Sequence, residues 1–329
     1  MLDSKNFAES QPARRWTQQV NAPFAFSTLN SADNQGCLPR RWAAAVMQIE
    51  KVQCRSILTR TGGYLRPVCS HTMNPYAGCG FGGTLCGVGC YVRANSWLLR
   101  GRVWGRFLEV KQNAAAVYRQ TCAAEQRWAR RRGGPFSIFL ASSTEPWQPA
   151  EREFRITRGL LEAMLECPPE VLILQTHSSQ ILEDRERIHA LSHLTKLRVH
   201  ISIESDRDRL PGLPGPPCSV AGRMEAVRMM AKSGVFSVVC VSPLHPIEQP
   251  DRFFRALAEC GAGAVVIDHF IGGDGTRLGA RTLKTDLPRA MERLAPESVA
   301  LAYRDAMAAV ARRYLPTGLS AAGFAGHYE

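Results

Sequence analysis

The sequence has 329 residues, 45% of them hydrophobic and 21% charged, which allows a sizeable core and excludes a disordered or fibrous protein. Its formal net charge of +12 would suit a polyanionic partner such as nucleic acid. That signal is incomplete, because no recognition motif accompanies the charge and an arginine excess also follows from a GC-rich coding sequence.

The expected location follows from the hydropathy pattern and the cysteines. The first thirty residues show no charged region followed by an uninterrupted apolar stretch, and no later apolar run approaches the ~18 residues of a membrane span. We therefore expect a cytoplasmic protein with no membrane partner. Eleven cysteines in a reducing compartment argue against a disulfide framework, so a tight cysteine cluster favours metal binding or catalysis.

The chain divides into three parts. Residues 1–45 mix Gln, Asn, Ser and Pro without a clear period, and we interpret them as an N-terminal extension. Residues 46–285 form the main predicted domain, and residues 286–329 form a C-terminal helical segment. In the main domain, short apolar runs rich in β-branched residues alternate with longer helical patterns, which indicates repeated βα units and a parallel sheet.

Five βα units are predicted after the cysteine-containing stretch Asn74–Tyr91. The predicted strands are Phe136–Ala141, Val171–Thr176, Arg198–Ile203, Val235–Val241 and Ala264–Phe270. The predicted amphipathic helices are Ala114–Arg132, Arg152–Glu166, Leu182–Leu194, Val220–Lys232 and Arg252–Cys260. Because loops after parallel strands gather on one face of a barrel, we expect Ser142–Gln148, His177–Ser179, Glu204–Asp206, Ser242–His245 and Ile271–Gly275 to converge.

Three cysteines lie close together in a glycine-rich stretch, Asn74–Tyr91. They are Cys79, Cys86 and Cys90, and the glycines would let the backbone wrap closely around a bulky inorganic core. Three thiolates can hold three irons of a [4Fe–4S] cluster and leave the fourth iron open to a small molecule. A structural zinc site is the alternative. It usually takes four protein ligands in two close pairs, which would require help from Cys54, Cys69 or His71.

Several segments together resemble the radical S-adenosylmethionine (SAM) superfamily, in particular its spore photoproduct lyase-like branch. The run Asn74–Cys79, followed by Cys86, Cys90, Tyr91 and Arg93, resembles the family's NPY-x-GC opening and its closing Cys-aromatic-x-Arg. Ser143–Glu151, Thr176–Ser178, Ser202–Asp206, Arg223–Ala226 and Val241–Leu244 are similar to later motifs of the branch and follow in the same order. The resemblance spans about residues 50 to 275.

This resemblance implies an α/β fold, a partial (β/α)6 TIM-type barrel whose open face holds the cluster and SAM. It implies that Cys79, Cys86 and Cys90 are the iron ligands and the catalytic centre, and that Thr144, His177, Ser202 and Ser205 contribute to the SAM site. It also implies an external one-electron reductant of flavodoxin or ferredoxin type. The chemistry would be reductive cleavage of SAM to a 5′-deoxyadenosyl radical, which takes hydrogen from a substrate.

The residues predicted for the SAM site could instead have purely structural roles. Ser202 and Ser205 lie in or just after a predicted strand, where either could satisfy backbone groups instead. Thr144 lies in a loop at a strand end, where capping of a following helix competes with cofactor binding. Both alternatives stay open at the level of sequence.

The sequence departs from the family pattern at four places. The cysteine spacing is C-x6-C-x3-C instead of C-x3-C-x2-C, and Gly89 replaces the aromatic residue that packs on adenine, a role that Phe81 or Tyr91 could take. His177 replaces a lysine, which predicts SAM affinity that depends on pH near the histidine pKa. Ser142 replaces the hydrogen-donating cysteine, so repair of the spore lesion itself is not expected unless Cys218 or Cys240 reaches the site.

Three functions follow from these patterns. The first is a lyase-like radical SAM enzyme acting on a nucleic-acid lesion or modified nucleotide in DNA repair, with Trp97, Trp104 and residues 127–132 as contacts. The second is a radical reaction on a small molecule or peptide. The third is a non-catalytic iron–sulfur protein that senses redox state or binds nucleic acid.

Overall fold

The computed structural model describes residues 47–329. The predicted N-terminal extension, residues 1–45, lies outside the described residues. No helix within residues 47–329 is long and apolar enough to cross a membrane.

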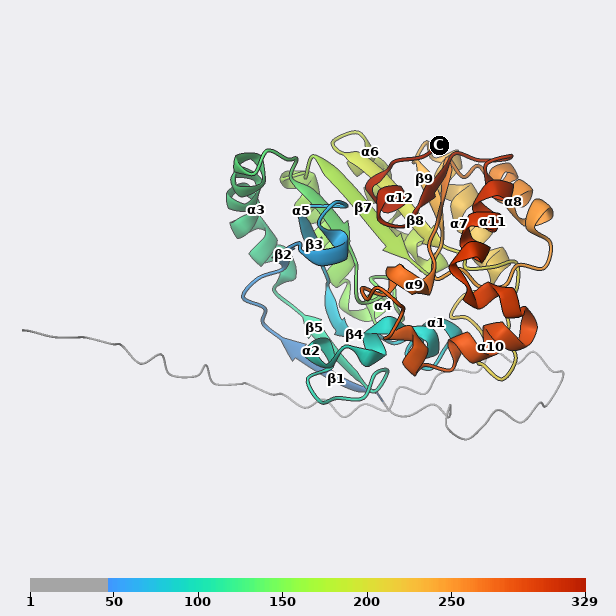
Figure 1. Cartoon of the computed structure of the whole chain (residues 1–329). Helices are drawn as coiled ribbons and strands as arrows, with labels where there is room; N and C mark the ends of the chain where they lie inside the picture. The colour runs from blue at the N-terminus through green and yellow to red at the C-terminus, as the bar shows by residue number, and fades with distance from the viewer. Residues whose placement is uncertain (1–46) are drawn as a thin grey trace, which may run out of the picture.

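The main sheet is an open, mostly parallel barrel (Figure 1). Its eight strands follow the order β11-β10-β9-β8-β7-β6-β3-β2, and only β2 runs antiparallel to its neighbour. The strands are β2 (Leu58–Arg60), β3 (His71–Met73), β6 (Ser137–Leu140), β7 (Val171–Thr176), β8 (Lys196–Ser202), β9 (Ser237–Val241), β10 (Ala264–Ile267) and β11 (Thr317–Leu319). The two edge strands do not pair with each other, so the predicted partial α/β barrel is confirmed.

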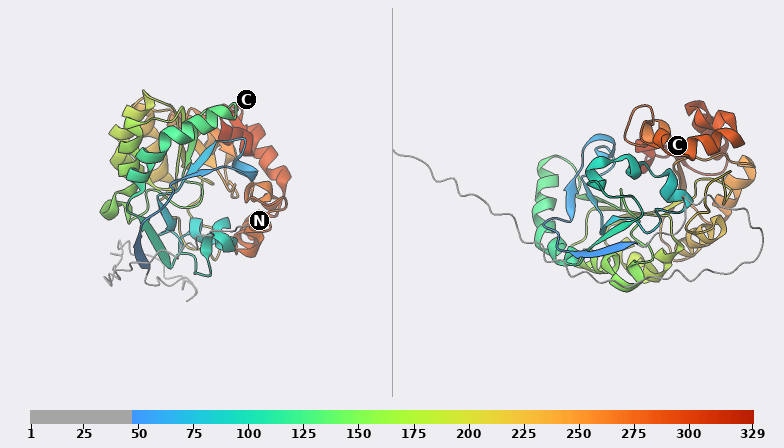
Figure 2. Two further views of the ribbon diagram at one scale, coloured as in Figure 1. Left: turned by 90° about the vertical axis from the view of Figure 1, so that its left-hand side faces the viewer. Right: turned by 90° about the horizontal axis from the view of Figure 1, so that it is seen from below.

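Helices cover the outer side of this sheet, in an arc that Figure 2 shows from below. The longer ones are α3 (Ala114–Arg131), α5 (Ile156–Glu166), α6 (Arg185–Ser192), α7 (Val220–Lys232), α8 (Pro250–Glu259) and α11 (Leu301–Ala311). Helix α10 (Leu287–Leu294) instead packs against Leu85 and Val88 of the cysteine segment, at the end of the barrel (Figure 1). Short helices are α1 (Leu85–Gly89), α2 (Ser96–Leu99), α4 (Glu151–Phe154), α9 (Phe270–Gly273) and α12 (Ser320–Ala325). The 3₁₀ turns are η2 (Gly63–Leu65), η3 (Tyr91–Ala94), η4 (Ser179–Asp184), η5 (Thr282–Lys284) and η6 (Pro296–Val299).

The predicted βα units lie on observed elements. The predicted strand Ala264–Phe270 ends earlier, at Ile267 of β10, and Phe270 begins α9. Two of the predicted helices also differ. The predicted helix Arg152–Glu166 is split into α4 and α5, because Arg155 adopts a left-handed conformation with φ 51° that ends the first turn. The predicted helix Leu182–Leu194 begins as the 3₁₀ turn η4 before α6. Both differences depend on the local backbone conformation, which the spacing of apolar residues does not predict.

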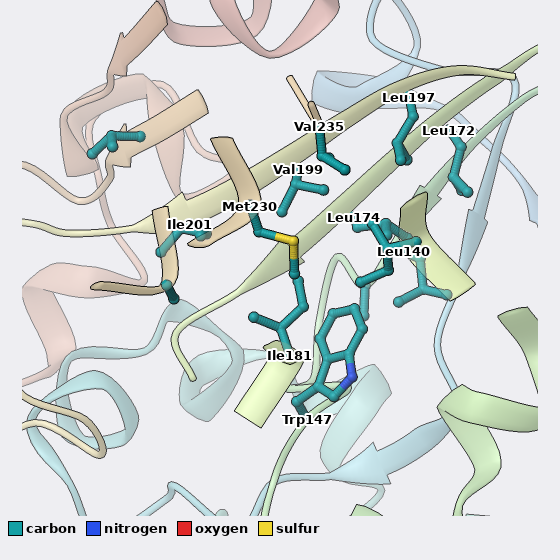
Figure 3. Packing of buried hydrophobic residues seen from close by; sticks show 14 of the residues in the cluster. Leu140, Trp147, Leu172, Leu174, Ile181, Leu197, Val199, Ile201, Met230 and Val235 are labelled. Carbon is teal, nitrogen blue, oxygen red and sulfur yellow. The ribbon is translucent and has the colours of Figure 1, made fainter. Parts of the chain in front are cut away.

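Apolar side chains fill the space between the sheet and the helices (Figure 3). On β8, Val199 and Ile201 point outward and are fully buried, as is Met230 of α7. The intervening positions of β8 point inward and are polar, namely Arg198, His200 and Ser202. This two-residue alternation gives the sheet an apolar outer face and a partly polar inner face.

The C-terminal segment packs inside the open barrel. Phe324 of α12 joins a buried inner cluster with Phe139 and Ile173, and its ring lies 6.3 Å from that of Phe139. Arg198 Nη1 donates a 2.7 Å hydrogen bond to the Ala325 carbonyl. The segment 286–329 therefore contains, besides helices, the unexpected strand β11, which extends the parallel sheet beside β10. Its start at residue 286 as a domain boundary stays a prediction.

A second, three-stranded sheet carries the cysteine segment. β5 (Phe107–Lys111) pairs in parallel with β1 (Gln48–Val52) and antiparallel with β4 (Tyr76–Gly78), which leads directly into Cys79. Gly78 has φ 87°, and a Cβ there would lie 2.1 Å from the Phe107 carbonyl oxygen. Only glycine fits this position, which fixes where the cysteine segment leaves the sheet.

Phe324 tests the role of the C-terminal segment in stability. We expect Phe324→Ala to lower the free energy of unfolding by about 3–5 kcal/mol, because it empties a buried site in the barrel. Phe236→Ala is the matched control, since Phe236 is 44% exposed and should lose less than about 1.5 kcal/mol. Urea denaturation followed by circular dichroism measures both, and equal losses would contradict the packing role of Phe324.

Candidate active site at the open end of the barrel

A cavity of about 170 Å³ lies at the carboxyl ends of the strands. All five predicted strand-end loops line it, through residues that include Thr144, His177, Glu204, Ser242 and Asp274. The cysteine segment closes one side. The sequence-based expectation that these loops converge is therefore met by the fold.

The three cysteines line this cavity together. Cys79 follows β4, Cys86 lies in α1, and Cys90 ends α1. Burial and the neighbouring Cys86 raise the pKa of Cys79 and raise that of Cys90 to about 12. Because Cys86 acts on both of the other thiols, the three sulfur atoms belong to one site.

The ligands that this site offers are thiols, which are the usual protein ligands of iron–sulfur clusters. Among residues 47–329, no three His, Cys, Asp or Glu side chains are placed to hold one metal ion. Gly87 brings the loop close on itself, since a Cβ there would lie 2.0 Å from the Phe81 carbonyl oxygen.

The aromatic side chains of the cavity come from new positions. A Cβ on Gly89 would lie 2.8 Å from Leu287 Cδ2, so Leu287 of α10 occupies the space near that position. Of the two predicted substitutes, Tyr91 lines the cavity and donates a 2.5 Å hydrogen bond to the Ser142 carbonyl. Phe81 instead packs in the apolar cluster behind the cysteines. Trp104 also lines the cavity, and its buried Nε1 has no hydrogen-bond partner within residues 47–329.

A chain of alternating charges crosses the cavity wall. His177 Nδ1 lies 3.6 Å from Glu145 Oε2, and its Nε2 lies 3.2 Å from Glu204 Oε1. Glu204 Oε2 is 2.6 Å from Nη1 of the fully buried Arg223, which also donates to the Ser202 carbonyl at 2.7 Å. Each buried charge thus has an opposite partner, as burial requires.

These neighbours control protonation. Burial would raise the pKa of Glu204, but the charge of Arg223 and the hydrogen bond from His177 hold it well below its usual range. Burial lowers the pKa of His177, but Cys86, Glu145 and Glu204 outweigh this and raise it well above the ordinary value. His177 therefore already has two carboxylate partners, Glu145 and Glu204.

The predicted SAM-site residues are placed differently from one another. Thr144 lines the cavity and its Oγ1 donates a 2.5 Å hydrogen bond to the Gly78 carbonyl. Ser202 is fully buried and accepts a 3.3 Å hydrogen bond from Gln175, and Ser205 donates at 2.6 Å to the Pro246 carbonyl. Neither serine is among the described residues that line the cavity, so their part in binding stays a prediction.

The thiols considered as hydrogen donors also lie away from the cavity. Cys240 is fully buried in the inner cluster of the barrel, and Cys218 contacts Ser179 Oγ at 3.3 Å. Neither lines the cavity described within residues 47–329.

Sequence reasoning missed two features of the cavity floor. Asp268, which follows β10, accepts hydrogen bonds from Tyr64 at 2.9 Å and Ser320 at 2.6 Å, and so joins three distant segments. Burial raises its pKa to about 6. Gln175 of β7 lines the cavity, and its buried Oε1 has no hydrogen-bond partner among the described residues. Polar residues at the ends of predicted strands could have indicated these two positions in the sequence. Their hydrogen-bond partners, however, depend on the fold.

The sequence matches no protein-family model. No curated protein matches it either. Among solved structures, it is similar to a spore photoproduct lyase mutant with dinucleoside spore photoproduct, at 16% identity and a TM-score of 0.54 over 89% of this chain and 87% of that one. It is also similar to a double mutant of the lyase with bound AdoMet and dinucleoside spore photoproduct, at 16% identity and a TM-score of 0.53 over 89% and 87% of the two chains.

A third spore photoproduct lyase mutant gives a TM-score of 0.53 at 16% identity, over 83% of this chain and 81% of that one. At this identity the likeness shows a shared fold. The resemblance inferred from the cysteine and strand-end motifs is confirmed at that level.

The buried pair Glu204–Arg223 yields a stability prediction. We expect Arg223→Met to cost about 3–5 kcal/mol, because it leaves the Glu204 carboxylate buried without its main partner. Adding Glu204→Gln to that variant should restore much of the loss, because the uncompensated charge is gone. Guanidinium denaturation of the two single variants and the double variant measures this, and strictly additive losses would refute the coupling.

Asp268 yields a pH prediction. Its pKa is about 6 in the folded protein and ~3.9 in an unfolded chain, so the folded state binds more protons between those values. Stability should therefore fall by on the order of 3 kcal/mol as pH rises from about 4 to about 6. Asp268→Asn should remove this fall, while the control Asp305→Asn, on an exposed side chain, should keep it. Denaturation across that pH range measures the effect, and the same pH dependence in wild type and Asp268→Asn would contradict the assignment.

Proposed function

We propose that this chain is a radical SAM enzyme that holds a [4Fe–4S] cluster on Cys79, Cys86 and Cys90. The observation that carries the proposal is that these three thiols line one cavity with all the strand-end loops. A solved structure with the same fold, a spore photoproduct lyase mutant, has bound AdoMet, which supports SAM as the cofactor. A redox sensor would not need a cavity beside its cysteines, so we favour an enzyme over the non-catalytic alternative.

The bound group would supply electron transfer to SAM and hydrogen abstraction from a substrate. The chain's own residues do the rest. Thr144 and His177 face the cavity and are our candidates for contacts with the amino-acid end of SAM. Tyr91 and Trp104 supply aromatic walls for adenine in place of the residue absent at position 89. Ser202 and Ser205 would support the end of β8 from beneath through their hydrogen bonds.

The charge of the cavity limits the substrate. Glu145, Glu204, Asp268 and Asp274 line it, so phosphate groups would be repelled from its interior. We propose that a nucleobase of a lesion or modified nucleotide enters while the phosphates stay outside. A lyase mutant of the same fold has bound a dinucleoside photoproduct, and the net charge of +12 suits nucleic acid.

The hydrogen donor must differ from a rim-loop cysteine. Ser142 occupies that place, and a hydroxyl O–H bond is too strong to give up a hydrogen atom to a carbon radical. We therefore do not assign repair of the spore lesion to this chain, and a different lyase-like or abstraction reaction is proposed.

We also propose that the protein works in the cytoplasm, where thiols stay reduced. The ten described cysteines are all free, so three of them are available as iron ligands without prior reduction of a disulfide. A flavodoxin or ferredoxin type reductant of that compartment would provide the electron.

The cysteine assignment makes a direct prediction. With SAM and dithionite, Cys86→Ala should form 5′-deoxyadenosine more than about 100-fold more slowly than wild type, a larger loss than a residue outside the ligand set causes. The control Cys54→Ala removes a thiol of similar partial burial outside the cavity and should keep wild-type activity. Liquid chromatography with mass detection measures the product. Wild-type activity in Cys86→Ala would exclude this ligand role.

A further inference from the structure

The chain around the cysteines is basic and lacks acidic residues. From Cys79 to Leu108 the sequence contains four arginines and no Asp or Glu. Arg93, Arg100 and Arg106 are exposed on this stretch. Arg102 is partly buried and forms an ion pair with Glu109. A long run of one sign of charge on a folded surface attracts a partner of the opposite sign.

Large apolar side chains stand exposed on the same stretch. Trp97 of α2 is 82% exposed, the highest value among the large hydrophobic residues described, and Val103 is 60% exposed. Tryptophan and arginine are the residues that most often carry the binding energy of protein interfaces. An exposed tryptophan within a basic surface therefore indicates a docking site for a protein.

A second segment of the same character lies beside the first. η5 packs against η3, which follows Cys90 directly. Around η5, Leu278 is 68% exposed and Leu283 is 56% exposed, and Arg277 and Lys284 are also exposed. Residues 275–285 contain no acidic residue. We call residues 93–106 and 277–284 together the basic rim.

Apolar side chains of the basic rim pack together with two of the cysteines. Leu98, Leu99 and Trp104 pack in the same apolar cluster as Cys79 and Cys90. An electron arriving at this surface would have a short path to the site.

We infer that the basic rim docks an acidic one-electron donor protein. This inference rests on the proposed function, since the electron is needed only if the three cysteines hold a cluster. The donor is oxidised by one electron and delivers it to the cluster through the layer of Leu98, Leu99 and Trp104, and no bond forms or breaks. Electron-transfer partners typically bind through small interfaces, which one tryptophan and a few arginines can provide.

An acidic protein fits this surface better than nucleic acid does. The rim covers the outer side of the cysteine segment, where an electron donor must approach but a substrate need not. The cavity that a substrate must enter is lined by four carboxylates and by only two of their cationic partners, His177 and Arg223, which disfavours phosphate inside it. Binding of DNA at the rim is thus the competing outcome that an experiment must detect.

The first test compares two reductants. We expect Trp97→Ala and Arg100→Glu to slow 5′-deoxyadenosine formation driven by a reduced flavodoxin by about 10-fold or more, as loss of an interface hot spot does. With dithionite, which needs no docking, their rates should equal wild type. The controls Leu194→Ala and Lys196→Glu match the apolar and charge changes just before and at the start of β8. They lie next to α6, at the opposite end of the sheet from α2 (Figure 1).

The second test measures binding alone. Cluster-free protein and a fluorescently labelled flavodoxin should associate in a salt-dependent manner. Each of the two rim variants should raise the dissociation constant of this complex by about 10-fold. The controls should leave it unchanged. Unchanged binding in both rim variants would overturn the inference, as would equal loss of the dithionite-driven rate. Loss of oligodeoxynucleotide binding without loss of flavodoxin binding would overturn it in favour of nucleic acid.

These tests separate two failures. Wild-type protein that forms no 5′-deoxyadenosine with dithionite would refute the proposed function, whatever the rim does. Wild-type turnover with dithionite, together with rim variants that behave as wild type with flavodoxin, would refute the rim alone.

Discussion

The common direction of the strands is the constraint on which the rest of this structure depends. β3 and β6 to β11 run parallel, so the loop that follows each of these strands begins at the same edge of the sheet. Five such loops and the cysteine segment therefore enclose one cavity, although they come from residues about 200 positions apart. The open edge between β2 and β11 leaves room inside for the C-terminal segment, which the tie between Tyr64, Asp268 and Ser320 holds in place.

Charge is arranged in opposite ways inside and outside this end of the molecule. Within the cavity, Glu145, His177, Glu204 and Arg223 alternate in sign, and two further carboxylates line the wall. Outside, the basic rim carries arginines and exposed apolar side chains but no carboxylate. The cavity is thus suited to cationic or neutral groups such as the sulfonium of SAM or a nucleobase. The surface is suited to a large acidic partner, and the two roles need not compete.

Sequence patterns predicted the repeating parts of the fold well. The bounds of β7 and α7 were predicted correctly, because β7 opens with the apolar run Val171–Leu174 and α7 follows the serine cap Ser219. The motifs also identified the cysteine segment. β11 was missed because Thr317–Leu319 is three residues long and is a strand only through its pairing with β10.

The side-chain partners in the site could not be predicted. Glu204 and Arg223 were each part of a recognised motif, but nothing in a linear pattern states that they form one ion pair. Likewise, the sequence shows that position 89 lacks an aromatic residue. It does not show that Leu287 of α10 occupies the space beside Gly89, because this contact depends on packing between distant segments. Ser205 matched its motif as well as Thr144 did, yet it bonds the Pro246 carbonyl and does not face the cavity.

The central claim is that Cys79, Cys86 and Cys90 hold a cluster with one iron open to SAM. Electron paramagnetic resonance of the anaerobically reconstituted, dithionite-reduced protein, with and without SAM, tests it most directly. The account predicts a [4Fe–4S]⁺ signal whose g values change when SAM is added. A protein that binds no iron–sulfur cluster and retains tightly bound zinc, or a cluster signal that SAM leaves unchanged, would contradict it.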